Sequence, residues 1–261
     1  MHSEEIPHDT MMPGISHVLF IDESGRGQAD RHGIPLNGVQ SLWISAAVGI
    51  EWRRVKDLDD GVKDILRNRF LGRCSELKAF NLRRYLPSQF NAGDVASDLS
   101  GLAKRVGAHV WITCSRTGCP PLPGMAGPRP LAKDVVRQLL LERVSGYATP
   151  KYFPNHSWLV VWDLSDVREL TDFSEDLAKF RNLHNYSQLN PAVYPALLGG
   201  LSHDWAGIQV ADVYANFALH RYGQALGLPD FNIDRATAFE QHLRPTLQKD
   251  ANGNEVGWKV W

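Results

Sequence analysis

Three aspartates stand at positions where a buried element would be expected to carry apolar residues. Asp22 and Asp163 each follow directly on four large apolar residues, and Asp212 is the only charged residue from 205 to 219. Because a lone buried carboxylate is costly, each needs a basic group, a hydrogen-bond donor or a metal ion beside it. Mg²⁺ and Mn²⁺ prefer carboxylate oxygens, and paired ions can activate a water for phosphodiester hydrolysis.

The elements that must position these aspartates are expected to form an α/β fold with a mixed central sheet flanked by helices. Apolar runs predict strands, and apolar residues repeating every three or four positions predict helices. The predicted strands cover about 17–22, 41–50, 108–114 and 157–163. The predicted helices cover 53–70, 94–106, 131–147, 167–180 and about 204–226. The stretch 118–130, with five prolines, is predicted to be a surface connection.

The carboxyl ends of strands are where sites form in open α/β sheets, so Asp22 and Asp163 are expected to meet there. On the predicted last helix, Asp212 shares one face with Ile208, Ala211, Ala215 and Leu219, and that face should pack on the sheet. The helix would therefore supply the third acid.

Each acid also has a plainer interpretation. An Asp after a strand often serves a turn or a helix cap, and a buried Asp212 can be satisfied by arginine or by backbone donors. Glu23 points to the opposite face from Asp22 on an extended strand, so it ranks second as a ligand. Ser24 and Gly25 are interpreted as a turn.

Four stretches resemble motifs of the domain-of-unknown-function 3800 family, in the same order along the chain. They are FIDESG (20–25), SELKAF (75–80), VVWD (160–163) and LSHDWAGIQVADVYA (201–215). The resemblance implies a ribonuclease H-like fold. It also implies that Asp22, Glu76, Asp163 and Asp212 take the places of four catalytic acids that bind two Mg²⁺ or Mn²⁺ ions.

In the ribonuclease H pattern, the third acid ends the strand that lies next to the first strand. The predicted strand at 108–114 intervenes in the sequence and ends in Cys114 and Ser115, without an acid. Asp163 lies close to Asp22 only if the strand at 157–163 is the neighbour of the first strand.

Residues that could contact substrate are Lys78, Ser24 and His203. Lys78 could bind a phosphate or pair with an acid. His203 could orient a water, although Asp204 as a helix N-cap with an incidental histidine is the more common arrangement. A further set of arginines could line a phosphate groove or form a solvated helix face; these are Arg53, Arg54, Arg67, Arg69, Arg73, Arg83 and Arg84. Trp205 could stack on a base if exposed.

The composition sets limits on partners and location. Lys and Arg total 28 against 29 Asp and Glu, so no bulk positive field attracts nucleic acid, and a polyanion must be held locally. The three cysteines, Cys74, Cys114 and Cys119, are too few for a disulfide framework. With no secretory signal and no long apolar run, we expect a cytoplasmic protein that does not enter a membrane.

We expect three regions: a flexible tail at 1–15, a ribonuclease H-like domain at 16–228, and an extension at 229–261 packed on that domain, mixed in composition and irregular. The leading functional hypothesis is a metal-dependent nuclease acting on RNA or DNA. The alternatives are a non-catalytic nucleic-acid- or protein-binding module of a bacterial or phage-defence system, and a phosphatase or small-nucleotide hydrolase using the same ions.

Overall fold

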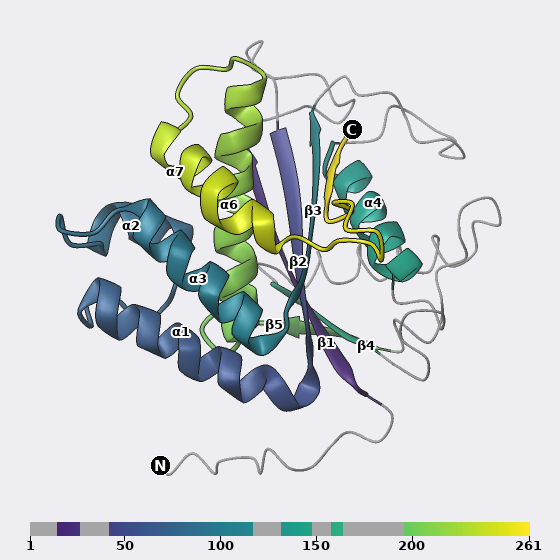
Figure 1. Ribbon diagram of the computed structural model, residues 1–261, viewed down its shortest axis with the longest axis horizontal. Helices are drawn as coiled ribbons and strands as arrows, with labels where there is room; N and C mark the ends of the chain where they lie inside the picture. Colours follow the sequence, from purple (N-terminus) through teal and green to yellow (C-terminus); the bar gives the residue numbers. More distant parts are fainter. Residues whose placement is uncertain (1–14, 27–41, 117–131, 148–157, 164–195) are drawn as a thin grey trace.

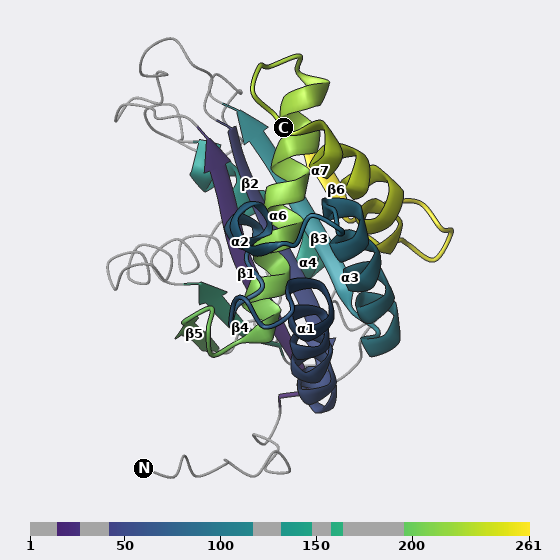
Figure 2. The same ribbon diagram turned by 90° about the vertical axis from the view of Figure 1, so that its left-hand side faces the viewer.

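A six-stranded mixed sheet separates the helices into two unequal groups (Figures 1 and 2). The computed structural model describes residues 15–26, 42–116, 132–147, 158–163 and 196–261. In spatial order the strands are β5 (Ala196–Gly200), β4 (Trp158–Asp163), β1 (His17–Arg26), β2 (Leu42–Glu51), β3 (His109–Arg116) and β6 (Trp258–Val260). The α/β prediction is confirmed.

The first three strands form an antiparallel meander, and the later strands add to its two edges in parallel. β2 pairs antiparallel with both β1 and β3. β4 lies parallel to β1, β5 lies parallel to β4, and β6 lies parallel to β3. The strand that ends in Asp163, β4, therefore borders β1, whereas β3 lies beyond β2.

Of the helices in the described ranges, α4 lies on one face of the sheet and the others lie on the opposite face (Figure 1). On the crowded face, α6 lies directly against β1 and β2, while α1, α2, α3 and α7 surround it. The helices are α1 (Val55–Phe70), α2 (Ala79–Tyr85), α3 (Ala92–Val106), α4 (Ala132–Tyr147), α6 (Ala206–Ala225) and α7 (Ile233–Ala238).

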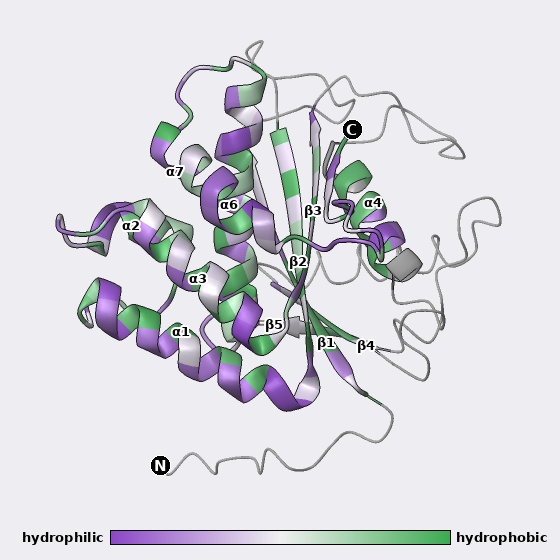
Figure 3. Cartoon of the chain, in the orientation of Figure 1, coloured by the Kyte–Doolittle hydropathy of each residue, from purple (hydrophilic) through white to green (hydrophobic). Residues whose placement is uncertain are grey.

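Alternation along the strands divides the core in two. Val18 and Phe20 of β1 belong to the large cluster beneath α6, and Leu19 and Ile21 pack with residues of α4 on the other face. Figure 3 shows the hydrophobic colour along β2 and the hydrophilic colour on the outer side of α1. Side chains of a strand point alternately to its two faces, so residues at every second position contact the same face of the sheet.

The predicted helices at 53–70 and 94–106 correspond to α1 and α3. The start of α3 is fixed by a capping box, in which Asn91 and Asp94 each accept a hydrogen bond from the other's backbone N–H. Gly107 ends the helix at φ 67°, a left-handed conformation that favours glycine. The chain then enters β3 directly.

The predicted turn after Asp22 is wrong. β1 continues to Arg26, and Ser24 and Gly25 pair with Ile44 and Trp43 of β2. A Cβ on Gly25 would lie 2.8 Å from the Trp43 ring, so this glycine allows the indole to cover the strand. Strand pairing with β2 therefore outweighs the turn propensity of the Ser-Gly pair.

The prediction of an irregular tail after Pro229 is also wrong. The chain forms α7, a π-helical turn at Phe239–Leu243, a 3₁₀ turn at Arg244–Thr246 and strand β6. α7 packs on α6 and α3, and β6 extends the sheet beside β3. Short elements of this kind carry too few turns to show an apolar period.

Several predictions fall outside the described residues. These are the tail at 1–14, the connection at 118–130, the helix at 167–180 and the position of Cys119. Within the described ranges, no helix combines the length and the apolar character needed to span a bilayer.

Candidate active site

Asp22 and Asp163 lie side by side on adjacent parallel strands. The register pairs Ile21 of β1 with Trp162 of β4, so the next residues on each strand are the two aspartates. Neighbouring strands lie about 4.8 Å apart, which brings the two backbones close. Both aspartates have the parity of the residues buried beneath α6, such as Phe20 and Val161, and therefore point to that face.

Helix α6 brings Asp212 to the same face because the helix lies tightly on β1. A Cβ on Gly207 would lie 2.1 Å from the Phe20 ring, so only glycine permits this approach. Trp205 packs on the same ring at 5.7 Å between centroids and belongs to the edge of the core. The hypothesis that Trp205 stacks on a base is therefore not favoured.

The three aspartates act on one another electrostatically. Burial raises the pKa of Asp22 well above its usual range, and the charges of Asp212 and Asp163 raise it further. The backbone N–H of Glu23 opposes this, since it donates to Asp22 Oδ1 at 2.6 Å. A carboxyl group surrounded by like charges gains from a bound cation, which would replace repulsion by attraction.

The surroundings of Asp212 are more balanced. Burial raises its pKa, while the backbone N–H of Ala79 and the charges of Lys78 and Arg235 lower it. Ala79 N donates to Asp212 Oδ2 at 2.6 Å, so the alternative of a buried Asp satisfied by backbone donors holds for this oxygen. The same bond fixes the start of α2 beside the aspartates.

Glu76 lies in the segment just before α2 and reaches the cluster through Lys78. Its Oε2 accepts a hydrogen bond from the Ser202 hydroxyl at 3.2 Å and lies 3.5 Å from Lys78 Nζ. Lys78 in turn lowers the pKa of Asp212. Lys78 therefore pairs with an acid, as one of its two interpretations proposed.

Gln209 lies in the last of the four stretches that carry the family resemblance, but no role was predicted for it. Its side chain is buried, its Oε1 accepts from Leu77 N at 2.8 Å, and its Nε2 donates to Ser202 O at 2.8 Å. It thus ties α6 to both segments that meet at Glu76. A polar residue three positions before Asp212 on an apolar helix is the signal that could have identified it.

Arg235 of α7 is a second residue that was missed. It donates to Ala79 O at 3.1 Å and to Asn216 Oδ1 at 2.6 Å, and its charge acts on Asp212. The C-terminal segment therefore contributes a guanidinium to the surroundings of the aspartates. Its sequence neighbourhood after Pro229 offered no pattern that pointed to this role.

The acid next to Asp22 is neutralised on the opposite face. Arg137 of α4 donates to both carboxylate oxygens of Glu23, at 2.9 and 2.7 Å, and its guanidinium lies 4.9 Å from the centre of the Trp162 ring. Arg137 is 3% exposed. The prediction that Glu23 points away from Asp22 agrees with this pairing.

His203 is exposed and lies 3.3 Å from Asp204, before the start of α6. The N-cap of that helix is Trp205, and no side chain caps it, so the prediction of Asp204 as N-cap is wrong. Ser24 lies inside β1, two residues beyond Asp22 on the same side of the strand. It therefore lies on the same face of β1 as Asp22 and does not form a turn.

The donor set fits a hard divalent cation in chemistry, since it consists of carboxylate oxygens. Among the described residues, however, no three His, Cys, Asp or Glu side chains stand in a geometry that would hold one ion. What the fold brings together is thus a cluster of mutually repelling aspartates on three elements.

No protein-family model matches the chain, and no curated protein matches it either. The cluster is therefore interpreted from its own residues.

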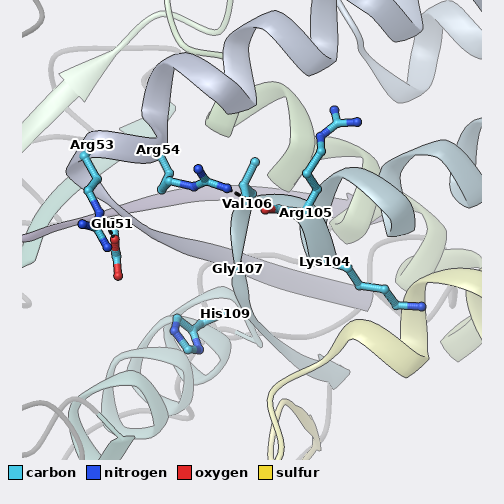
Figure 4. A pocket seen from close by; sticks show the side chains of 8 residues that line it. All are labelled: Glu51, Arg53, Arg54, Lys104, Arg105, Val106, Gly107 and His109. Atoms are coloured by element: carbon cyan, nitrogen blue, oxygen red, sulfur yellow. Dashed lines mark hydrogen bonds and ion pairs between the residues drawn. The ribbon is translucent and has the colours of Figure 1, made fainter.

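A basic pocket lies at the other end of the sheet. It is lined by Glu51, Arg53, Arg54, Lys104, Arg105, Val106, Gly107 and His109 (Figure 4). Glu51 pairs with His17 at the start of β1, whereas Asp22 pairs with Ala46. Arg54 donates to Arg105 O at 2.8 Å, so it serves the carboxyl end of α3. The arginines at this pocket bind neighbouring groups of the protein, and the pocket is separate from the aspartates.

Proposed function

We propose that this chain is a divalent-metal-dependent nuclease that hydrolyses phosphodiester bonds. The observation that carries the proposal is the cluster itself: Asp22, Asp163 and Asp212 come from three elements and face one side of the sheet. Burial raises the pKa of Asp22, and the charges of Asp212 and Asp163 raise it further. Repulsion among acids destabilises the fold. A bound cation would replace this repulsion by attraction between the cation and each carboxylate.

We propose in addition that the fold is ribonuclease H-like, as the resemblance to the domain-of-unknown-function 3800 family implies. The support is the place of β4, which borders β1 in parallel and carries Asp163 next to Asp22. This is the position that the ribonuclease H pattern requires for its third acid. A second support is Gln209, because it ties the second motif of the resemblance to the last one.

The residues divide into those that would hold ions and those that would meet the substrate. Asp22, Asp163 and Asp212 would hold Mg²⁺ or Mn²⁺, with Glu76 as the fourth acid. Bound ions of this kind supply an activated water and positive charge at the phosphate. Lys78, 37% exposed and balancing Glu76, would attract a backbone phosphate to the cluster.

The test is a cleavage assay with labelled single-stranded RNA, single-stranded DNA, duplexes and an RNA–DNA hybrid, in Mg²⁺, Mn²⁺ or chelator. Cleavage should need the divalent ion, and Asp212→Asn should abolish it while the chain stays folded. The amide oxygen can still accept from Ala79 N, so the variant removes charge and keeps shape. Asp59→Asn, an exposed α1 residue paired with Lys63, is the matched charge control.

Three results would count against the proposal. Full activity of Asp212→Asn would remove this residue from the ion-binding set. Cleavage that persists in chelator would assign the activity to other chemistry or to a contaminant. Binding of nucleic acid without cleavage under every condition, unaffected by Asp22→Ala, would favour the non-catalytic binding module instead.

A further inference from the structure

The short helix α2 is fixed against the aspartate cluster from two sides. Its first residue, Ala79, donates its N–H to Asp212 and accepts at its carbonyl from Arg235, at 2.6 and 3.1 Å. Just before the helix, Leu77 N donates to the buried Gln209. Because these bonds link α2 to both α6 and α7, its outer face has a defined place beside the cluster.

That outer face combines an aromatic ring with two guanidinium groups. Phe80 is 69% exposed, and Arg83 and Arg84 follow at three and four residues, on the same side of the helix. The buried residues of α2, Ala79 and Leu82, turn toward the core. The exposed ring therefore has two arginines as neighbours on the helix surface.

The arginines of α2 differ from those of α1. In the described part of the chain, Arg67 pairs with Asp64 and Arg69 pairs with Asp98, whereas Arg83 and Arg84 form no ion pair with a carboxylate. Arg84 instead lies 5.2 Å from the centre of the Tyr85 ring. The positive charge of α2 is therefore available to an external anion.

We propose that the outer face of α2, made of Phe80, Arg83 and Arg84, binds single-stranded nucleic acid and presents it to the aspartates. A base would stack on Phe80, and the flanking phosphates would meet the guanidinium groups. Bases in a duplex are covered by their neighbours, so stacking of this kind selects single strands. This inference deepens the proposed nuclease function. It rests on that function for the claim that the bound nucleic acid continues to the aspartates.

The place of Phe80 in the chain gives the proposal its geometry. The preceding residue, Ala79, is hydrogen-bonded to Asp212, so the exposed ring leaves α2 one residue away from a contact with the cluster. Lys78, the residue before Ala79, carries a further positive charge that lies 3.5 Å from Glu76 and acts on Asp212. The positive charges of α2 attract phosphate. The aspartates repel it unless a cation is bound to them.

The experiment measures binding without cleavage. Full-length protein in chelator is titrated into a fluorescently labelled single-stranded DNA, the same sequence as RNA, and the corresponding duplexes, with anisotropy as the signal. Phe80→Ala should weaken single-strand binding by about 5–150-fold, the range for loss of one stacked base. Phe80→Tyr should retain affinity. Ile233→Ala, which removes an equally exposed side chain on α7, is the matched control.

Salt dependence tests the guanidinium groups separately. The double variant Arg83→Ala/Arg84→Ala should reduce the slope of log affinity against log salt by about 1.4, since each phosphate contact to a single strand contributes about 0.7. Arg67→Ala on α1, whose guanidinium is already paired, should leave the slope unchanged.

The outcomes separate this proposal from the nuclease proposal. Single-strand binding that depends on Phe80, together with no cleavage in Mn²⁺, would uphold the α2 surface and reject the nuclease. Cleavage with a KM unaffected by Phe80→Ala would uphold the nuclease and reject the α2 surface. The α2 proposal is also overturned if duplexes bind as tightly as single strands, or if the wild-type protein binds no strand at all.

Discussion

On the α4 face of the sheet, Glu23 accepts two hydrogen bonds from the buried Arg137. On the α6 face, one residue earlier on the same strand, burial raises the pKa of Asp22, and the charges of Asp212 and Asp163 raise it further. The two acids are consecutive residues of one strand. They differ in whether the fold supplies a positive partner of matching geometry.

The difference separates a structural charge from a functional one. A carboxylate that binds an arginine through two hydrogen bonds has a partner within the fold, so its presence needs no ligand to explain it. A carboxylate placed against other carboxylates is not, and pKa values perturbed in this way gather at functional sites. The following variants test whether the two faces behave as differently as this comparison requires.

The largest effect is expected on the α4 face. Arg137→Met should lower the free energy of unfolding by about 3–5 kcal/mol, because Glu23 would stay buried without its guanidinium. Urea denaturation followed by circular dichroism measures the loss. Adding Glu23→Leu to the same chain should recover much of it; a single variant as stable as wild type would show that the ion pair is dispensable.

On the α6 face the support is a hydrogen bond, so the loss should be smaller. Gln209→Leu keeps the side chain's size but leaves Leu77 N and Ser202 O without their partner, at a cost of about 1–3 kcal/mol. Amide hydrogen exchange at Leu77 should become faster. Unchanged exchange there would mean that the segment before α2 is held by other contacts.

Removal of the charge of Asp22 should stabilise the fold, unlike the two preceding substitutions. In chelator, Asp22→Asn should raise the free energy of unfolding by about 0.5–2 kcal/mol, the size of gain that single stabilising substitutions commonly give, because it removes a buried charge that faces two others. Glu23→Gln, its neighbour, should lower stability. Thermal denaturation of the two variants in parallel makes the comparison, and a loss for both would place Asp22 in a structural role.

The gain from Asp22→Asn should also depend on pH. Folding raises the pKa of Asp22 above its ordinary value of 3.8, so above that value the folded chain binds more protons than the unfolded chain, and wild-type stability falls as pH rises. Below 3.8 both states are protonated, and the penalty is absent. The advantage of the variant should therefore grow as pH rises from 3.8 through the folded pKa, and a gain independent of pH would contradict the assignment.

Much of the cluster could be predicted from the sequence because apolar runs and helical faces are local patterns. Asp22, Asp163 and Asp212 stood out as acids inside such patterns, and strand alternation correctly separated Glu23 from Asp22. The neighbour of β1 could not be decided locally, because strand order depends on packing across the whole sheet.

Other parts of the site depend on contacts that no local pattern contains. Arg137 meets Glu23 across 114 residues of sequence, and Arg235 meets Ala79 across 156. Helix α2 is too short for an apolar period, so the exposure of Phe80 became visible only once Ala79 and Leu82 were seen to be buried. The Ser-Gly pair at 24–25 misled because its turn propensity was outweighed by pairing with β2.

The most direct test of the central claim is binding of Mn²⁺ to the full-length protein, measured by isothermal titration calorimetry without nucleic acid. Wild-type protein should bind the ion, and Asp22→Asn, Asp163→Asn and Asp212→Asn should each lose more than about tenfold in affinity, whereas Glu23→Gln should keep it. Circular dichroism confirms that every variant is folded. Folded wild-type protein that takes up no Mn²⁺, or three asparagine variants that bind as tightly as wild type, would contradict the account.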